Sequence, residues 1–204
     1  VAREIGLSRV VLTSTSEALG SAQADKMDES HPLVAQSPYA ATKIAADKLG
    51  EAYCRSFDTP VVTLRPFNTF GPRQSRRAVI PTVVSQLLGG DSVRVGSTTT
   101  SRDFLYVKDT ARAFRLAATM PSIEGRTIHV GTGTAVTIAD VIQSVGRLLE
   151  RTPRVIVESD RVRPEASEVS RLLCDNTLAK SLIGFEPEWT LERGLSETIT
   201  YWRD

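Results

Sequence analysis

The 204-residue chain is poor in the residue types that mark metal sites and disulfide frameworks. Its two cysteines, Cys54 and Cys174, and two histidines, His31 and His129, are too few for a cluster of metal ligands, so no metal site is expected. The cysteines lie far apart in the sequence, and we expect them to be the reduced thiols of a cytoplasmic protein.

Strong net charge and long apolar runs are also lacking. A formal net charge of +1 gives no long-range attraction to nucleic acid or to an anionic membrane. No apolar run approaches the ~18 residues that a transmembrane helix needs. We therefore expect neither a nucleic-acid partner nor a membrane partner.

The residues that are present alternate between apolar, β-branched segments and segments of helical periodicity. This alternation favours an α/β fold with a parallel sheet. The pattern predicts strands at 9–13, 60–65, 92–95 and 126–130, and helices at 38–56, 79–89, 108–120, 138–150 and 191–202. Gly89 and Gly90 form a stop signal for the second helix, and Thr137 suits the cap of the fourth. The segment 1–6 is expected to be the end of a helix.

Tyr39 and Lys43 are four residues apart, a spacing that puts both side chains on one face of a helix. Ser37 is a suitable N-cap for that helix, and Pro38 suits its first position. An ammonium group beside a phenol favours the phenolate, which can exchange protons with a sugar or alcohol hydroxyl. The spacing alone is common in helices, so the assignment depends on its neighbours.

Thr15 and Glu17 follow the predicted strand 9–13. Ligands of open α/β sheets bind beyond the carboxyl ends of the strands, so these two side chains lie where chemistry is expected. The alternative is a turn rich in Ser and Thr that satisfies its own backbone.

Several motifs in a fixed order support the first interpretation. They are Thr13-Ser14-Thr15-Ser16-Glu17-Ala18-Leu19-Gly20, Tyr39-x-x-x-Lys43, Arg65-Pro66-Phe67-Asn68-Thr69-Phe70-Gly71-Pro72-Arg73-Gln74, Ser101-Arg102-Asp103-Phe104-Leu105-Tyr106-Val107-Lys108-Asp109, Val130-Gly131-Thr132-Gly133 and Arg163-Pro164. In these motifs the chain resembles the extended short-chain dehydrogenases/reductases, and more narrowly the NAD-dependent epimerase/dehydratase family that acts on nucleotide sugars. The resemblance covers essentially the whole chain.

The resemblance implies a bound NAD that oxidises the sugar at C4 and later reduces the product. It makes Tyr39 the base for the C4 hydroxyl, Lys43 its tuning partner and a ligand of the nicotinamide ribose, and Thr15 a partner of the same hydroxyl. Ser14 and Pro66 are implied as further cofactor-binding residues.

The same resemblance implies a nucleotide-diphosphate sugar as substrate. Asn68 is expected to bind the sugar or its phosphate, and Arg102 and Arg163 are expected to clamp the diphosphate with their planar guanidinium groups. The cluster of Arg73, Arg76 and Arg77 is expected to be a solvated loop. Asp103, Tyr106 and Asp109 are expected to fix the loop and cap the next helix.

The resemblance also implies that Glu17 selects the reaction; the alternative is a solvated loop carboxylate. Relatives with a Ser/Thr-x-Glu arrangement include 4,6-dehydratases, in which the glutamate removes the C5 proton, whereas simple 4-epimerases need no carboxylate there. We therefore expect 4,6-dehydration, with 4-epimerisation as the alternative. Ser16 stands where the dTDP-glucose type has an aspartate, and Ser37-Pro38-Tyr39 is unusual for the sugar-nucleotide decarboxylases.

The family begins with a strand and a glycine-rich turn that holds the NAD pyrophosphate. No such segment occurs in this sequence, so the expected fold is the C-terminal half of a Rossmann-type parallel sheet with a smaller interleaved substrate domain. Residues 1–72 and 103–133 are expected to form the NAD-binding part, and 73–102 and 134–204 the sugar-nucleotide part. We expect a fragment of a longer homodimeric enzyme, and the alternative is a non-catalytic fragment that binds the sugar nucleotide.

Overall fold

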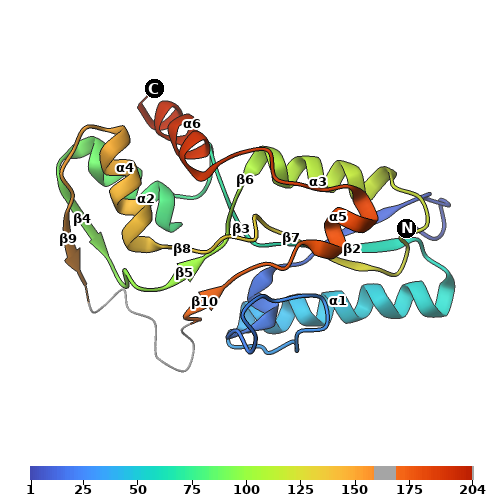
Figure 1. The fold of residues 1–204 in the computed structure, drawn as a ribbon. Coiled ribbons are helices and arrows are strands. Elements are labelled where there is room, and N and C mark those ends of the chain that lie inside the picture. Colours follow the sequence, from blue (N-terminus) through green and yellow to red (C-terminus); the bar gives the residue numbers. More distant parts are fainter. Residues whose placement is uncertain (159–168, 204) are drawn as a thin grey trace.

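A computed structural model of the chain describes residues 1–158 and 169–203 (Figure 1). Its centre is a three-stranded parallel sheet in which β2 (Val61–Pro66) lies between β1 (Val10–Thr13) and β7 (Thr127–Val130). Val11 pairs with Val62, and Leu64 pairs with Ile128. The predicted Rossmann-type α/β fold with parallel strands is therefore confirmed.

Helices cover both faces of this sheet. The long helix α1 (Pro38–Phe57) packs below β2 in the view of Figure 1, while α3 (Val107–Thr119) and α5 (Thr177–Ile183) pack above. Ala113 and Ala117 of α3 are fully buried against the sheet, because small side chains let a helix approach a strand closely. Strand β2 is buried over almost its whole length, which explains its continuous apolar start.

A second group of elements surrounds a separate apolar cluster. Helix α2 (Val79–Gly89) packs against α4 (Ile138–Leu148) and α6 (Leu191–Arg203), beside the parallel pair β4 (Ser92–Val95) and β9 (Arg154–Val157). The cluster is built from aliphatic side chains that repeat at helical spacing, such as Ile80, Val84, Leu87, Val141, Ile142, Val145, Leu195 and Ile199.

Short strands connect the two groups. β3 (Asn68–Phe70) pairs in parallel with β6 (Phe104–Tyr106). β5 (Ser101–Arg102) pairs with β10 (Arg171–Leu172) on one side and with β8 (Val136–Thr137) on the other. In Figure 1 these short strands lie between the central sheet and the second group of helices.

All nine elements predicted from sequence are present, with ends within two residues of those expected. Ser37 and Thr137 cap α1 and α4 through their side chains as expected. The sequence did not predict α5, the short 3-10 helix η1 (Ser16–Leu19), or the short strands β3, β5, β6, β8, β9 and β10.

Segment 1–6 forms hydrogen-bonded turns rather than an assigned helix. The N–H of Ile5 donates to the Val1 carbonyl (3.0 Å) and that of Leu7 to the Ala2 carbonyl (3.2 Å). Gly6 has a φ of 63°, so the segment ends as helices commonly end, with a left-handed glycine.

Segment 134–204 contributes to both apolar clusters. Its helices α4 and α6 belong to the second group, whereas Ala179, Ile183 and Phe185 pack with β2 and β7. Among the helices of residues 1–158 and 169–203, none combines the length and apolar character of a membrane span.

Candidate active site

Helix α1 carries Tyr39 and Lys43 at its beginning. The Ser37 hydroxyl accepts a hydrogen bond from the Ala40 N–H (3.1 Å), and Pro38 occupies the first turn. The Lys43 ammonium donates to the Thr13 carbonyl at the end of β1 (2.8 Å). The Tyr39 side chain is 51% exposed, and its hydroxyl has no partner among the described residues. Both groups are therefore accessible to a ligand.

Thr15 and Glu17 lie directly after β1. Thr15 caps the short helix η1, and its hydroxyl oxygen accepts a hydrogen bond from the Glu17 N–H (3.3 Å). Since that oxygen accepts from the backbone, the hydroxyl proton of Thr15 is still available for a ligand. The Glu17 side chain is half-buried and borders a large pocket.

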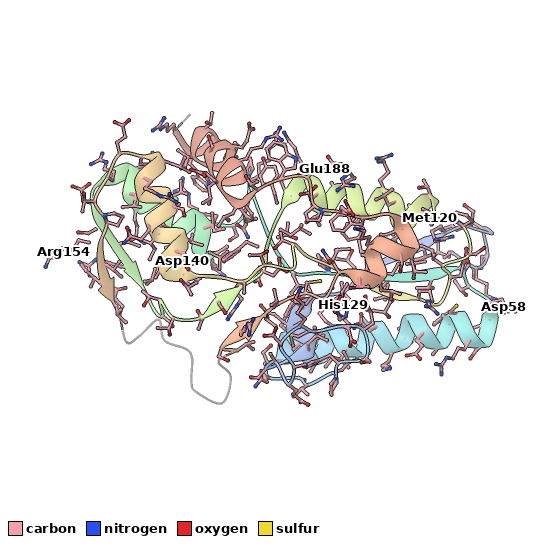
Figure 2. All side chains as sticks on the ribbon, viewed as in Figure 1. Asp58, Met120, His129, Asp140, Arg154 and Glu188 are labelled. Atoms are coloured by element: carbon pink, nitrogen blue, oxygen red, sulfur yellow. The ribbon has the colours of Figure 1, made fainter. Side chains whose placement is uncertain are left out.

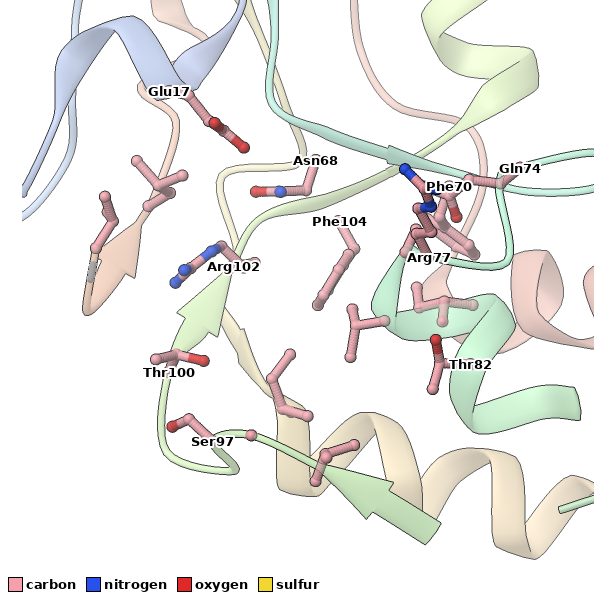
Figure 3. Close-up of a pocket in the computed structure, with 18 of the residues that line it drawn as sticks. Glu17, Asn68, Phe70, Gln74, Arg77, Thr82, Ser97, Thr100, Arg102 and Phe104 are labelled. Atoms are coloured by element: carbon pink, nitrogen blue, oxygen red, sulfur yellow. The ribbon is translucent and has the colours of Figure 1, made fainter. Parts of the chain in front are cut away.

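The pocket has a volume of about 870 Å³ and lies between the sheet and the second group of helices. Glu17, Asn68 and Arg102 all line it, although they come from η1, β3 and β5 (Figure 3). Gln36 and Ser37 border it as well, so the start of α1 lies at its margin. Tyr39, Lys43 and Thr15 are not among its lining residues.

Two buried amide oxygens in this pocket have no hydrogen-bond partner among the described residues. They are Oδ1 of Asn68 and Oε1 of Gln74. The Gln74 amide donates to the Thr69 carbonyl (2.8 Å), which fixes the direction of its side chain. Buried acceptors without donors are costly, so both side chains would gain by turning toward a ligand that supplies hydroxyl or N–H groups.

The charged lining of the pocket is strongly cationic. Among the described lining residues, one carboxylate, Glu17, is accompanied by four guanidinium groups, those of Arg76, Arg77, Arg94 and Arg102. Arg102 donates to the carbonyl of Ser101 (2.9 Å), and Arg94 pairs with Glu158 (2.9 Å). Guanidinium groups bind phosphate oxygens with two parallel hydrogen bonds, so this lining suits an anionic diphosphate.

Arg77 and Gln74 were missed as pocket residues by the sequence reasoning. The loop with Arg73, Arg76 and Arg77 was expected to be only solvated; Arg76 and Arg77 are exposed but also line the pocket. Arg76 additionally stacks over the Trp202 ring, 4.9 Å from its centroid. The sequence did contain a signal for them: Gln74 is the last residue of the Arg65–Gln74 motif, and Arg76 and Arg77 follow it closely.

Arg163 and Pro164 lie outside the described residues, so the structure does not place them. Ser14 and Pro66 were predicted as cofactor-binding residues; Ser14 directly follows β1, and Pro66 is the last residue of the adjacent strand β2. The Ser14 side chain is 3% exposed, and its hydroxyl donates to Asp47 (2.6 Å). A contact of Ser14 with a ligand would therefore involve its backbone.

Behind the strand ends lies a buried ionic network. The Arg65 guanidinium donates to Asp47 Oδ2 (2.7 Å), to the Ser14 hydroxyl (3.2 Å) and to Nε2 of His129 (2.8 Å). His129 Nδ1 donates to the Met27 carbonyl (3.1 Å), which leaves Nε2 as the acceptor. Burial, and then the neighbouring Arg65, lowers the pKa of His129 from 6.5 to about 3. His129 is therefore neutral, near the centre of the molecule (Figure 2).

Asp103 and Asp109 act as organisers of loops. The buried Asp103 carboxylate accepts hydrogen bonds from the backbone of Thr132 (2.7 Å) and Gly133 (2.8 Å). Burial raises the pKa of Asp103, and these donors oppose the increase. Asp109 accepts from the N–H groups of Glu188 and Trp189 rather than capping α3, which corrects the expectation that it is a helix cap.

The sequence of the chain is similar to those of curated proteins. The chain is 30% identical over 202 residues to the low-salt glycan biosynthesis protein Agl12 of Haloferax volcanii, covering 98% of this chain and 64% of that protein. It is 28% identical over 207 residues to a dTDP-glucose 4,6-dehydratase of Xanthomonas campestris, covering 95% and 57%. The chain therefore spans about three fifths of the length of these curated relatives.

A solved structure shows the same architecture. The UDP-glucuronic acid 4-epimerase of Bacillus cereus, in complex with UDP-glucuronic acid and NAD, superposes with a TM-score of 0.91 at 25% identity. The match covers 99% of this chain and 63% of that one. A family model described as GDP-mannose 4,6 dehydratase matches residues 1–198. The chain thus belongs to the GDP-mannose 4,6-dehydratase family of NAD-dependent epimerases and dehydratases.

Proposed function

We propose that this chain is the catalytic and sugar-nucleotide-binding portion of an enzyme that modifies a nucleotide-activated sugar through a 4-keto intermediate, by 4,6-dehydration. The observation that carries the proposal is the pocket in which Glu17, Asn68 and Arg102 converge from three separate elements. A carboxylate, an amide oxygen with no partner in residues 1–158 and 169–203, and a guanidinium group are the groups needed to move a proton, hold a sugar and bind a diphosphate.

The cationic lining supports a nucleotide-diphosphate sugar as substrate. In the part of the lining that the structure describes, four arginines against one carboxylate favour the two negative charges of the diphosphate. The buried acceptor oxygens of Asn68 and Gln74 suit the hydroxyl groups of the sugar or the N–H groups of the base. We assign Arg102 to the diphosphate, and we assign Arg163 the same role from its sequence motif alone.

The residues present fit the nicotinamide-ribose end of NAD. Lys43 uses one of its three donors on the Thr13 carbonyl, so two remain for ribose hydroxyls. The exposed Tyr39 hydroxyl lies one helical turn away and has no competing partner among the described residues. In that described part, no glycine-rich turn joins a strand to a helix; Gly131 and Gly133 follow β7 and lead into β8. NAD, when bound, supplies reversible oxidation of the sugar at C4.

The chain's own residues supply the proton transfers. Tyr39 accepts the proton of the C4 hydroxyl, Lys43 stabilises the phenolate, and Thr15 donates to the same sugar oxygen. Oxidation at C4 acidifies the C5–H bond, and Glu17 takes that proton. Glu17 can then pass the proton to the departing C6 hydroxyl, which leaves as water. The C5–C6 double bond that remains would be closed by the hydride that the reduced cofactor would return to C6 and by a proton of solvent origin at C5.

We further propose that the protein is a homodimer in which α1 meets its counterpart from a second copy. Only Ala40 and Asp47 of the 20 residues of α1 are buried. Leu49 and Tyr53 are 60% and 45% exposed on one stripe with Ala41 and Ala45, and small side chains there allow close helix packing. Sedimentation equilibrium of the Leu49→Glu variant should show monomers where the parent shows dimers.

The two remaining assignments also stand as proposals. We place the sugar-nucleotide part mainly in the second group of helices, with residues 1–72 and 103–133 on the cofactor side. A cytoplasmic location is supported by Cys54 and Cys174, which are both free thiols in the structure.

The test is product analysis with the full product of the gene. The protein is incubated with NAD and a panel of nucleoside-diphosphate hexoses, and the products are followed by mass spectrometry and NMR. Loss of one water with formation of a 4-keto-6-deoxy sugar supports 4,6-dehydration. A product of unchanged mass with inverted C4 identifies a 4-epimerase. Tight binding without conversion of any hexose identifies a non-catalytic binding protein.

A further inference from the structure

Two side-chain hydrogen bonds, one helical turn apart, connect helix α1 to the end of β1. The Lys43 ammonium donates to the Thr13 carbonyl (2.8 Å), and one helical turn later Asp47 accepts from the Ser14 hydroxyl (2.6 Å). The two strand residues are consecutive and the two helix residues are four apart. Both hydrogen bonds therefore connect α1 to the end of β1, one turn apart, but only the one between Ser14 and Asp47 is buried.

Asp47 is the one polar residue that is buried on α1, whose other residues, apart from Ala40, are half-buried or exposed. Ala40 is the other buried residue of α1, and an alanine contributes little resistance to rotation of the helix. Asp47 is held more firmly, because its Oδ2 accepts from both Ser14 and the Arg65 guanidinium (2.7 Å). Oδ1 of Asp47 has no partner among the described residues, so both interactions depend on one oxygen.

The network extends from this anchor across the sheet. Arg65 on β2 contacts His129 on β7 (2.8 Å), and the neutral ring of His129 contacts the Met27 carbonyl (3.1 Å). Asp47, Arg65 and His129 are at most 6% exposed. A buried ion pair is costly to form and poor at adding stability, but it enforces one geometry because any displacement leaves a buried charge unpaired.

We propose that Ser14 and Asp47 are positioning residues, which set the rotation and height of α1 so that Tyr39 and Lys43 face the reacting sugar and the nicotinamide ribose. This inference rests on the proposed function. The Tyr39 hydroxyl has no hydrogen bond to any residue that the structure describes, so the position of this side chain follows that of the helix. A displacement of about 1 Å in a reacting group can cost on the order of 100-fold in rate.

The test compares two variants that each lose one buried hydroxyl, in the full product of the gene. Ser14→Ala removes the hydrogen bond to Asp47 and the one that Arg65 donates to the Ser14 hydroxyl (3.2 Å), but leaves the ion pair of Asp47 with Arg65. The matched control is Thr198→Val, in which a buried hydroxyl on α6 loses its hydrogen bond to the Gly194 carbonyl (2.7 Å). Three quantities are measured: kcat and KM, the dissociation constant of NAD, and amide hydrogen exchange of residues 39–43 without substrate.

Ser14→Ala is expected to lower kcat about 10- to 100-fold. Its KM and its dissociation constant for NAD should change less than about threefold, because no ligand contact is removed. Exchange of residues 39–43 should become faster in Ser14→Ala, whereas Thr198→Val should leave kcat and this exchange unchanged.

Two results would overturn the proposal. One is parent-like kcat and exchange in Ser14→Ala. The other is an equal effect of Thr198→Val, which would show that loss of any buried hydroxyl suffices. If the parent protein converts no nucleotide sugar, the proposed function fails, and the exchange measurement alone then decides whether Ser14 positions α1.

Discussion

Tyr39 and Lys43 lie one turn apart on α1, yet of their two side chains only that of Lys43 is hydrogen-bonded within residues 1–158 and 169–203. The Lys43 ammonium is directed to the Thr13 carbonyl, while the Tyr39 hydroxyl is open to solvent. This asymmetry suits a pair in which the lysine is fixed and the phenol exchanges a proton with a substrate.

Replacing Tyr39 by Phe should lower turnover by about 10²- to 10⁴-fold, because the proton acceptor is lost while the ring remains. Substrate affinity should change much less, since the pocket lining does not include Tyr39. Steady-state kinetics and calorimetry of the full gene product measure the two effects separately. Tyr53→Phe is the matched control on the same helix, and near-parental turnover of Tyr39→Phe would disprove the assignment.

Replacing Arg102 by Lys should weaken diphosphate binding about tenfold, because the ammonium cannot make two parallel hydrogen bonds to phosphate. Titration with a nucleoside diphosphate in the calorimeter measures this affinity without any catalytic step. Arg55→Lys, at a 78% exposed guanidinium on α1, serves as control and should leave the affinity unchanged. Equal affinities of the Arg102→Lys variant and the parent would remove Arg102 from the binding site.

His129 should make the protein less stable in acid. Because burial lowers the pKa of His129 from 6.5 to about 3, the unfolded chain takes up a proton over this range while the folded chain does not. The stabilisation is present above the unfolded pKa and is lost as the pH falls toward the folded pKa. It should decrease by roughly 2 kcal/mol between pH 7 and pH 5.

Urea unfolding at several pH values measures this loss. The His129→Gln variant keeps a donor for Met27 and an acceptor for Arg65 but does not titrate. Its free energy of unfolding should therefore fall less between pH 7 and pH 5 than that of the parent. Parallel curves for the two proteins would show that the histidine is not held neutral.

The long elements were predictable because their signals are local. Ser37 and Pro38 define the start of α1 by capping chemistry, and the apolar run of β2 is long enough to show burial. Strands β5 and β8 contain two residues each, too few for any periodicity, and exist because they pair with each other. Sequence reasoning could not find such strands without their partners.

In the candidate site, too, some residues could be predicted from sequence and others could not. The motifs pointed to Glu17, Asn68 and Arg102, and the structure places all three on one pocket. The roles of these three residues in catalysis and substrate binding remain predictions. No pattern in the sequence indicated the ion pair between Asp47 and Arg65. A charged residue usually indicates a solvent-exposed position, and these two are 18 residues apart. Only the tertiary fold shows that both are buried.

The choice between dehydration and epimerisation depends on Glu17. If its carboxylate removes the C5 proton, the full gene product should form a 4-keto-6-deoxy sugar that carries solvent deuterium at C5 when the reaction runs in D₂O. Glu17→Gln keeps the size of the side chain but cannot accept a proton, so formation of this product should fall at least about 100-fold.

NMR of the product reports the position of the deuterium, and kinetics report the loss of rate. Glu188→Gln is a suitable control, because this exposed carboxylate lies outside the pocket and pairs with Arg112. An epimerase would give the opposite pattern. Its product would keep the 6-hydroxyl and carry no deuterium, and Glu17→Gln would change its rate little, because an epimerase moves no proton at C5. Such an unlabelled, C4-inverted sugar would show that Glu17 only lines the pocket.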